Sequence, residues 1–172
     1  MTGGGLDGTG PDAAPDPRIR SARPADADRL RELQSFLRQP NPDVLEYGLA
    51  VGDALVSVAE RGAGGAGESD ETVRSDHHRG TERVVGYLLP VDGPTRAGVH
   101  LAELAVAPTH RREGRARGLL AAVIADADGP VTLQAHPDND GALALYDEFG
   151  FDVVGRRANA YPDGDALALR LD

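Results

Sequence analysis

The chain has 172 residues, a formal net charge of −10 and no cysteine. The length suits one domain with its own core. The lack of cysteine excludes disulfides, thiolate metal sites and cysteine nucleophiles, and the acidity argues against nucleic-acid binding. No run approaches membrane-spanning length and the N-terminus lacks the features of a secretory signal, so no membrane contact and a cytoplasmic location are predicted.

The basic residues of the chain are all arginine. An acidic, lysine-free composition rich in alanine and glycine resembles halophilic proteins, because high salt screens the repulsion between the carboxylates. A GC-rich genome that favours Arg, Ala and Gly codons explains the same composition. Both explanations are compatible with the functional interpretation below.

The N-terminal part begins with residues 1–17, which have almost no large apolar side chain and are predicted to form a disordered, acidic tail rich in Gly and Pro. Residues 18–172 are predicted to form one domain. A strand is expected at Ile19–Ala22, and apolar residues at helical spacing predict a helix over Pro24–Gln39. Asp43–Val51 fits a helix and an extended chain equally well.

Two strands follow, at Ala54–Ala59 and Arg83–Val91. The residues between them are polar, charged and rich in glycine, so a flexible insertion is predicted at about residues 62–81. The two strands are therefore expected to form a hairpin with a long connection.

The C-terminal half alternates between strands and helices before a final hairpin. In chain order, the expected elements are a strand at Ala97–Val106, a helix from Gly114 to about Asp126, a strand at Val131–Ala135, a helix at Asp138–Phe149, and strands at Phe151–Val154 and Ala166–Leu171. Hairpins combined with two strand–helix–strand crossings predict a mixed sheet with helices on both faces.

The stretch Leu101–Leu120 predicts a site for a phosphorylated ligand. Its apolar run ends at Pro108, and a loop rich in Arg and Gly then leads into a helix, whose N-terminus offers free N–H groups and a favourable dipole. A Walker loop is excluded because the chain has no lysine, and the glycines lack the spacing of a dinucleotide fingerprint. The pattern that remains is R-x-x-G-x-A, over residues 111–116.

This pattern resembles the acetyl-CoA pyrophosphate loop of the GNAT superfamily of N-acetyltransferases. The segment from Asn139 to Phe151 resembles that family's N-x-x-A-x-x-L-Y-x-x-x-G-F motif, and the C-terminal residues are similar to acetyltransferases of ribosomal-protein N-termini. The resemblance implies an α/β (α+β) fold with a mixed, mostly antiparallel sheet of six to seven strands, helices on both faces and a splayed central strand pair.

The resemblance also implies where acetyl-CoA binds, with no metal. The pantetheine arm lies in the gap between the splayed strands, and the thioester lies beside the backbone of Leu104, Ala105 and Val106. Asn139 contacts the pantetheine or phosphate part, although simple capping of its helix is an alternative. The pyrophosphate binds to the loop and helix start, which comprise Arg111, Arg112, Glu113, Gly114, Arg115, Ala116 and Arg117.

Three residues are candidates for the chemistry. Tyr146 is expected to protonate the departing thiolate, and a core tyrosine is the alternative. Ribosomal-protein acetyltransferases place a glutamate where this chain has Gln134, which cannot accept a proton. Glu103 is the substitute candidate for the base, with a structural role as its alternative. His100 is a second candidate, and it faces the opposite side of a regular strand unless a bulge intervenes.

The sequence therefore predicts an acetyl-CoA-dependent N-acetyltransferase in which a primary amine attacks the thioester directly in a ternary complex. The acceptor is a peptide or protein N-terminus, a polyamine or another small amine, and His136 and Tyr161 are candidates to line its side of the site. The alternative function is a non-catalytic acyl-CoA-binding regulatory domain. A monomer and a homodimer are both compatible with the sequence.

Overall fold

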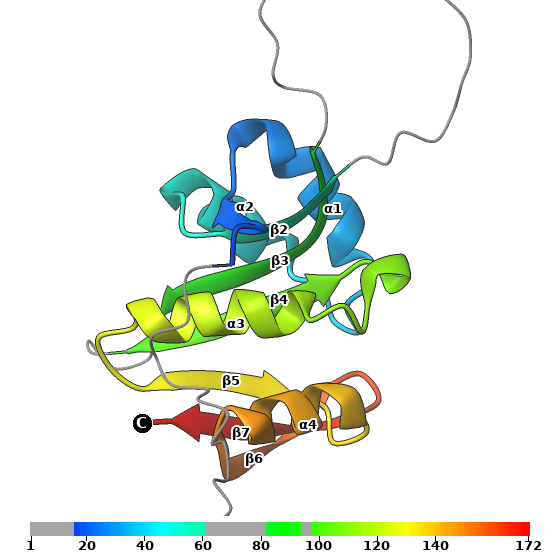
Figure 1. Ribbon diagram of the computed structural model, residues 1–172. Coiled ribbons are helices and arrows are strands. Elements are labelled where there is room, and N and C mark those ends of the chain that lie inside the picture. The colour runs from blue at the N-terminus through cyan, green and yellow to red at the C-terminus, as the bar shows by residue number, and fades with distance from the viewer. Residues whose placement is uncertain (1–15, 61–81, 94–97) are drawn as a thin grey trace, which may run out of the picture.

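The computed structural model describes residues 16–60, 82–93 and 98–172 (Figure 1). The predicted insertion at 62–81 and residues 1–15 of the predicted tail lie outside these ranges. Asp16 belongs to the folded part, because its carboxylate pairs with Arg18 at 2.6 Å. A Cβ atom added to Gly118 would lie 2.8 Å from the same carboxylate, so Asp16, which the sequence assigns to the tail, lies close to Gly118.

Seven strands form one sheet in the order β1-β2-β3-β4-β5-β7-β6. Only β4 and β5 pair in parallel, and all other neighbours are antiparallel. The predicted mixed, mostly antiparallel sheet of six to seven strands is therefore confirmed. The strands are β1 (Ile19–Ser21), β2 (Leu55–Glu60), β3 (Glu82–Asp92), β4 (Val99–Val106), β5 (Val131–Ala135), β6 (Asp152–Tyr161) and β7 (Gly164–Leu171).

The helices of the described residues are α1 (Ala27–Gln34), α2 (Pro42–Val51), α3 (Arg115–Asp126) and α4 (Asp140–Glu148), with short 3-10 turns at η1 (Pro24–Asp26) and η2 (Pro108–His110). The ambiguous segment is the helix α2, because Asn41 caps it by accepting from Val44 N and Gly52 ends it at a φ of 83°.

The first helix is shorter than the predicted Pro24–Gln39. After Gln34 the backbone makes tight bonds between residues three apart, such as Phe36 N to Leu33 O at 3.1 Å. The side chain of Gln34 is buried and hydrogen-bonded to Glu103. This long-range contact holds the end of α1 in place, and a helical spacing of apolar residues does not predict it.

Helices cover both faces of the sheet, as predicted (Figure 1). In β3, Tyr87 and Leu89 belong to the core cluster that contains residues of α1 and α2. Leu88, between them, belongs to the cluster that contains residues of α3 and α4. Because successive strand residues face opposite sides, α1 and α2 form one layer and α3 and α4 form the other.

The central parallel pair separates along its length, which confirms the predicted splay. Strands β4 and β5 are paired only from Val99 to Leu101, and β4 then continues to Val106 without β5 as a neighbour. The closed end is fixed by Val99 N, which donates to Pro130 O at 3.0 Å. The open end therefore lies toward the C-terminal ends of the two strands.

A β-bulge in β4 changes which side chains share a face. Leu89 of β3 lies opposite Glu103 and Pro90 lies opposite Leu101, so Ala102 is an extra residue on β4. The bulge allows His100 and Glu103 to face the α1 and α2 side together. A regular strand would place them on opposite sides.

Candidate active site

The loop after β4 adopts a left-handed backbone at two positions. Arg112 has a φ of 67° and Gly114 has a φ of 75°, and α3 begins at the next residue. A positive φ is unfavourable for a residue with a Cβ atom, so Arg112 marks a strained loop of the kind that collects at functional sites. The sequence thus places its glycine where the chain must turn into the helix.

The space beside Gly114 is free of protein. A Cβ atom added to this glycine would meet no protein atom within 4 Å. The first residues of α3 have no intrahelical acceptors for their N–H groups, and the helix dipole favours an anion at this end. An open surface next to unpaired donors is suited to a phosphate group.

The predicted loop arginines do not all point to this space. Arg115 is buried, and its guanidinium donates to Val58 O at 2.5 Å and pairs with Glu113 at 3.1 Å. The Nε atom of Arg111 donates to Val106 O at 3.1 Å. Arg115 was predicted as part of the loop that binds the pyrophosphate, but its buried side chain joins α3 to β2.

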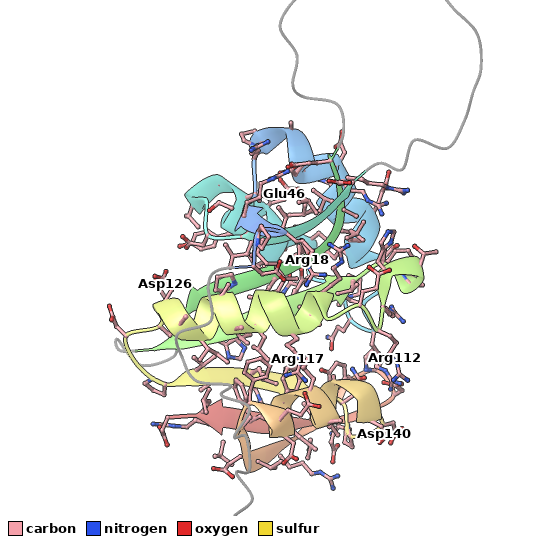
Figure 2. The ribbon with its side chains drawn as sticks, in the orientation of Figure 1. Arg18, Glu46, Arg112, Arg117, Asp126 and Asp140 are labelled. Atoms are coloured by element: carbon pink, nitrogen blue, oxygen red, sulfur yellow. The ribbon has the colours of Figure 1, made fainter. Side chains whose placement is uncertain are left out.

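Two of the arginines, Arg112 and Arg117, lie at the surface. Arg112 extends away from the loop, and Arg117 lies between α3 and α4 (Figure 2). Arg117 pairs with Glu148 of α4, and its guanidinium lies over the ring of Phe149 at 5.8 Å. Within the loop, Arg112 thus has the more accessible charge, while Arg117 also ties the helices together.

Two residues of the second motif lie on α4 and beside it. Asn139 caps α4, since its side-chain oxygen accepts from Ala142 N at 3.3 Å, which is the alternative role foreseen for it. Tyr146 is buried and its ring packs edge to face on Phe151 at 5.7 Å. Burial raises the pKa of Tyr146 to about 12, with a further contribution from nearby Tyr161.

Glu103 is held by four hydrogen bonds. One carboxylate oxygen accepts from Gln34 Nε2 and Asn41 N, each at 2.9 Å, and the other accepts from Tyr87 Oη at 2.7 Å and Gln34 Nε2 at 3.1 Å. Gln34 Nε2 contacts both oxygens, so three donor groups take up most of the roughly four acceptor positions of the carboxylate. This arrangement argues against the predicted proton relay through Glu103 and favours a role in positioning the segment between α1 and α2.

His100 has one contact that fits either tautomer. Its Nδ1 lies 3.0 Å from the Thr132 hydroxyl, which also lies 3.4 Å from Val99 O. When the hydroxyl donates to Val99 O, Nδ1 carries the hydrogen and the lone pair of the neutral ring is on Nε2. Burial, helped by the positive charge of Arg157, holds the pKa of His100 below its usual range, so the neutral form predominates near pH 7.

The sequence did not predict Arg38 or Asp163 as site residues. Arg38, between α1 and α2, pairs with Asp163 of the β6–β7 turn at 2.6 Å. His136 and Tyr161 were suggested for the acceptor side, and their rings lie 5.2 Å apart. Arg38 and Asp163 are 125 positions apart in the sequence, and no local pattern indicates such a pair.

One cavity lies away from this region. It has a volume of about 230 Å³ and lies at the C-terminal end of α3, where Asp53, Pro90 and Asp126 contribute to its walls. The described residues contain no cluster of three potential metal ligands. None of the helices in the same ranges has the length and hydrophobicity to span a membrane. The site is therefore assigned from the loop and the strand splay.

The structure combines a splayed parallel strand pair, a left-handed loop and the start of a helix. This combination is expected of an α/β protein that binds an anionic ligand where its sheet opens. The model of the Acetyltransferase (GNAT) family matches residues 68–151, just under half of the chain. A relative, the mycothiol acetyltransferase of Clavibacter sepedonicus, is 53% identical over 33% of this chain and 18% of its own length. The chain spans less than half the length of the curated relatives it matches, from 18% to 41%.

Solved structures share the fold. NAA60 of Arabidopsis thaliana in complex with acetyl-CoA has a TM-score of 0.68 at 20% identity, over 89% of this chain and 97% of its own. The ribosomal-protein-S18-alanine N-acetyltransferase of Escherichia coli has a TM-score of 0.64 at 17% identity, over 89% of this chain and 91% of its own. At these identities the likeness establishes the fold.

Gly114 and Gly52 provide a matched test of the loop. Both have a positive φ, and a Cβ atom added to either would lie in open space, so alanine at either position should destabilise the fold by about 1–2 kcal/mol. Only Gly114→Ala should also weaken acetyl-CoA binding, by at least about tenfold, or about 1.4 kcal/mol. Calorimetric titration of the two variants measures this difference, and equal affinities would remove the loop from the cofactor site.

Proposed function

We propose that the protein transfers an acetyl group from acetyl-CoA to a primary amine by direct attack in a ternary complex. The observation that carries this proposal is the opening between β4 and β5, together with the left-handed loop at Gly114 that follows β4 and with Tyr146, which belongs to the same buried cluster as Leu133 and Ala135 of β5. The GNAT domain match supports the same chemistry. The location in the cytoplasm and the halophilic origin remain predictions from composition.

The chain's own groups fit acetyl-CoA in a specific way. The backbone N–H groups from Arg112 to Arg117 would bind the pyrophosphate, with the charge of Arg112 nearby. The unpaired part of β4, from Leu104 to Val106, would offer its backbone to the pantetheine arm and the thioester. Asn139 would act indirectly, by fixing the start of α4.

The reaction forms a C–N bond between the amine and the acetyl carbon and breaks the C–S bond. It requires removal of one proton from the attacking nitrogen and delivery of one proton to the departing sulfur. Tyr146 would supply the second proton, because its raised pKa keeps the phenol protonated at neutral pH. Solvent would then restore the tyrosine.

His100 is the better of the two predicted candidates for the base. Its Nε2 can carry the lone pair when Nδ1 donates to Thr132, whereas the Glu103 carboxylate already accepts from Gln34, Asn41 and Tyr87. His100 lies four residues before Leu104, a distance of roughly 13 Å along a strand. A chain of water molecules would therefore have to carry the proton from the amine to His100.

The acceptor belongs to one of two groups of amines. The E. coli neighbour is named for an alanine of ribosomal protein S18, and the Clavibacter relative is named for mycothiol. Both names are compatible with an opening that admits an amine from the α1 and α2 side. The second candidate function is a regulatory domain that binds acyl-CoA without transfer, and Gln134 favours it because an amide cannot take a proton.

The function is tested by measuring CoA release with a panel of amines. The panel includes peptides, polyamines and a thiol compound that carries a free primary amine. The assay is run at low and at high salt, because the chain is strongly acidic. Acetylation of at least one amine is expected. Tight acetyl-CoA binding without transfer to any of them would favour the regulatory domain.

Tyr146→Phe should lower kcat about a hundredfold or more while leaving acetyl-CoA affinity nearly unchanged. The ring and its contact with Phe151 remain, and only the proton donor is lost. In the wild type, no loss of rate from ionisation of Tyr146 is expected below about pH 11, because the donor stays protonated until the pH approaches its raised pKa. An unchanged kcat would assign Tyr146 to packing alone.

His100→Gln should remove the acid limb of the pH–rate profile. A base acts in its neutral form, and the lowered pKa of His100 means that the rate should rise to its plateau below the ordinary histidine pKa of about 6.5. Glu103→Gln is the matched comparison and should keep this limb while lowering the melting temperature. A profile that keeps its limb in His100→Gln would exclude His100 as the base.

A further inference from the structure

An ion pair joins the two sides of the opening between β4 and β5. Arg38 Nη1 lies 2.6 Å from Asp163 Oδ2, and the two side chains are 43% and 55% exposed. Arg38 belongs to the segment between α1 and α2, and Asp163 belongs to the turn between β6 and β7. The pair thus connects two segments that are far apart in the sequence.

The register of the sheet places this pair at the open end. Strand β7 runs antiparallel to β5 with Leu167 opposite Ala135, so the turn before β7 lies beyond the C-terminal end of β5. On the other side, Asn41 N donates to Glu103 of β4 at 2.9 Å. The segment that carries Arg38 is therefore fixed to β4, and the pair spans the route by which an acceptor would enter.

A buried histidine lies directly behind Asp163. The side chain of His136 is only 7% exposed, and its Nδ1 accepts from Asp138 N at 3.1 Å. The neutral ring must then carry its hydrogen on Nε2. Among the described residues this buried nitrogen has no hydrogen-bond partner, although Asp163 Oδ1 lies 3.7 Å away.

Asp163 thus lies between the exposed guanidinium of Arg38 and the buried Nε2–H group of His136, which has no hydrogen-bond partner among the described residues. An unsatisfied buried donor is costly, and a small movement of the turn would bring Asp163 within hydrogen-bond distance of His136. The same group is close to the proposed chemistry. The charges of Arg38 and Asp163 both act on the pKa of Tyr161, and Tyr161 in turn acts on the pKa of Tyr146.

We propose that Asp163 binds a second cationic group of the acceptor, which displaces Arg38, and that His136 orients the Asp163 carboxylate through its Nε2 hydrogen. The proposal rests on the proposed function, because it concerns acceptor choice at the same opening. The preferred substrate class is an amine that carries another positive charge, such as a diamine or a peptide with a basic residue close to its N-terminus.

The exposure of the ion pair makes this exchange feasible. Exposed pairs contribute little, about two- to fivefold in an equilibrium constant, so Arg38 is readily displaced. An acceptor cation that fills the opening would shield Asp163 from water and bind it more strongly, as charge-assisted hydrogen bonds do. An acceptor without a second positive charge would leave Arg38 paired with Asp163. An acceptor with a second positive charge would displace Arg38 at a small cost in binding free energy.

The test compares kcat/KM for α,ω-diamines and n-alkylamines of matched length, and for two peptides that differ only by lysine or norleucine at the second position. The wild type should favour the dicationic member of each pair. Asp163→Asn should reduce this preference at least about tenfold, and His136→Phe should reduce it in the same direction. Arg38→Gln should lower KM for the dicationic acceptors by about two- to fivefold.

Asp165→Asn is the matched control, because it removes the same charge from the same hairpin. Asp165 lies 3.7 Å from Arg156 and accepts from Asn159 N, and asparagine keeps an acceptor oxygen for that bond. This variant should keep the preference of the wild type. An active Asp163→Asn enzyme with an unchanged preference would overturn the proposal, even though the acetyltransferase function would stand.

A binding measurement separates the two proposals if no amine is acetylated. With the CoA-loaded protein, a diamine should shift the imidazole NMR signals of His136, and the matched alkylamine should shift them much less. The shift should be lost in Asp163→Asn and retained in Asp165→Asn. If the diamine leaves the His136 signals unchanged, the proposed Asp163 site is rejected independently of catalysis.

Discussion

The short pairing between β4 and β5 is the constraint on which the rest of the site depends. Three residue pairs hold the strands together, from Val99 to Leu101, and the strands then separate. Beyond this point β4 has no neighbouring strand on the side of β5. Backbone N–H and C=O groups that are left unpaired on that side need another partner. A ligand with an extended amide chain can supply that partner, and this is why the opening is the proposed binding site.

Both layers of helices contribute to keeping this opening intact. On one side, Arg115 anchors the start of α3 to β2 through Val58 O and Ser57 Oγ. On the other side, Glu103 holds the end of α1 and the start of α2 against β4. Buried charged groups are tolerated because their hydrogen bonds are nearly complete. Such residues can resemble catalytic ones in the sequence, since both are charged residues in apolar surroundings.

The sequence predicted the features that depend on local patterns. The periodicity of the apolar residues located most of the strands, although β6 continues to Tyr161, beyond the predicted end at Val154. The glycine at 114 was predicted at the start of a helix, and the structure adds that its backbone is left-handed. The inward direction of Arg115 could not be predicted, because Ser57 and Val58 are nearly sixty positions away. The bulge at Ala102 has no signal in its own residue type, and it decides that His100 and Glu103 share a face.

Two histidines show how much the hydrogen bonds add to the residue type. His100 lies in the paired part of β4, and its contact with the Thr132 hydroxyl fits either tautomer. His136 is buried beside the β6–β7 turn, and its Nδ1 accepts from Asp138 N, so the neutral ring carries its hydrogen on Nε2. The proposed roles differ for this reason, because the neutral His136 ring can only donate through Nε2, whereas His100 can accept a proton there when its hydrogen is on Nδ1.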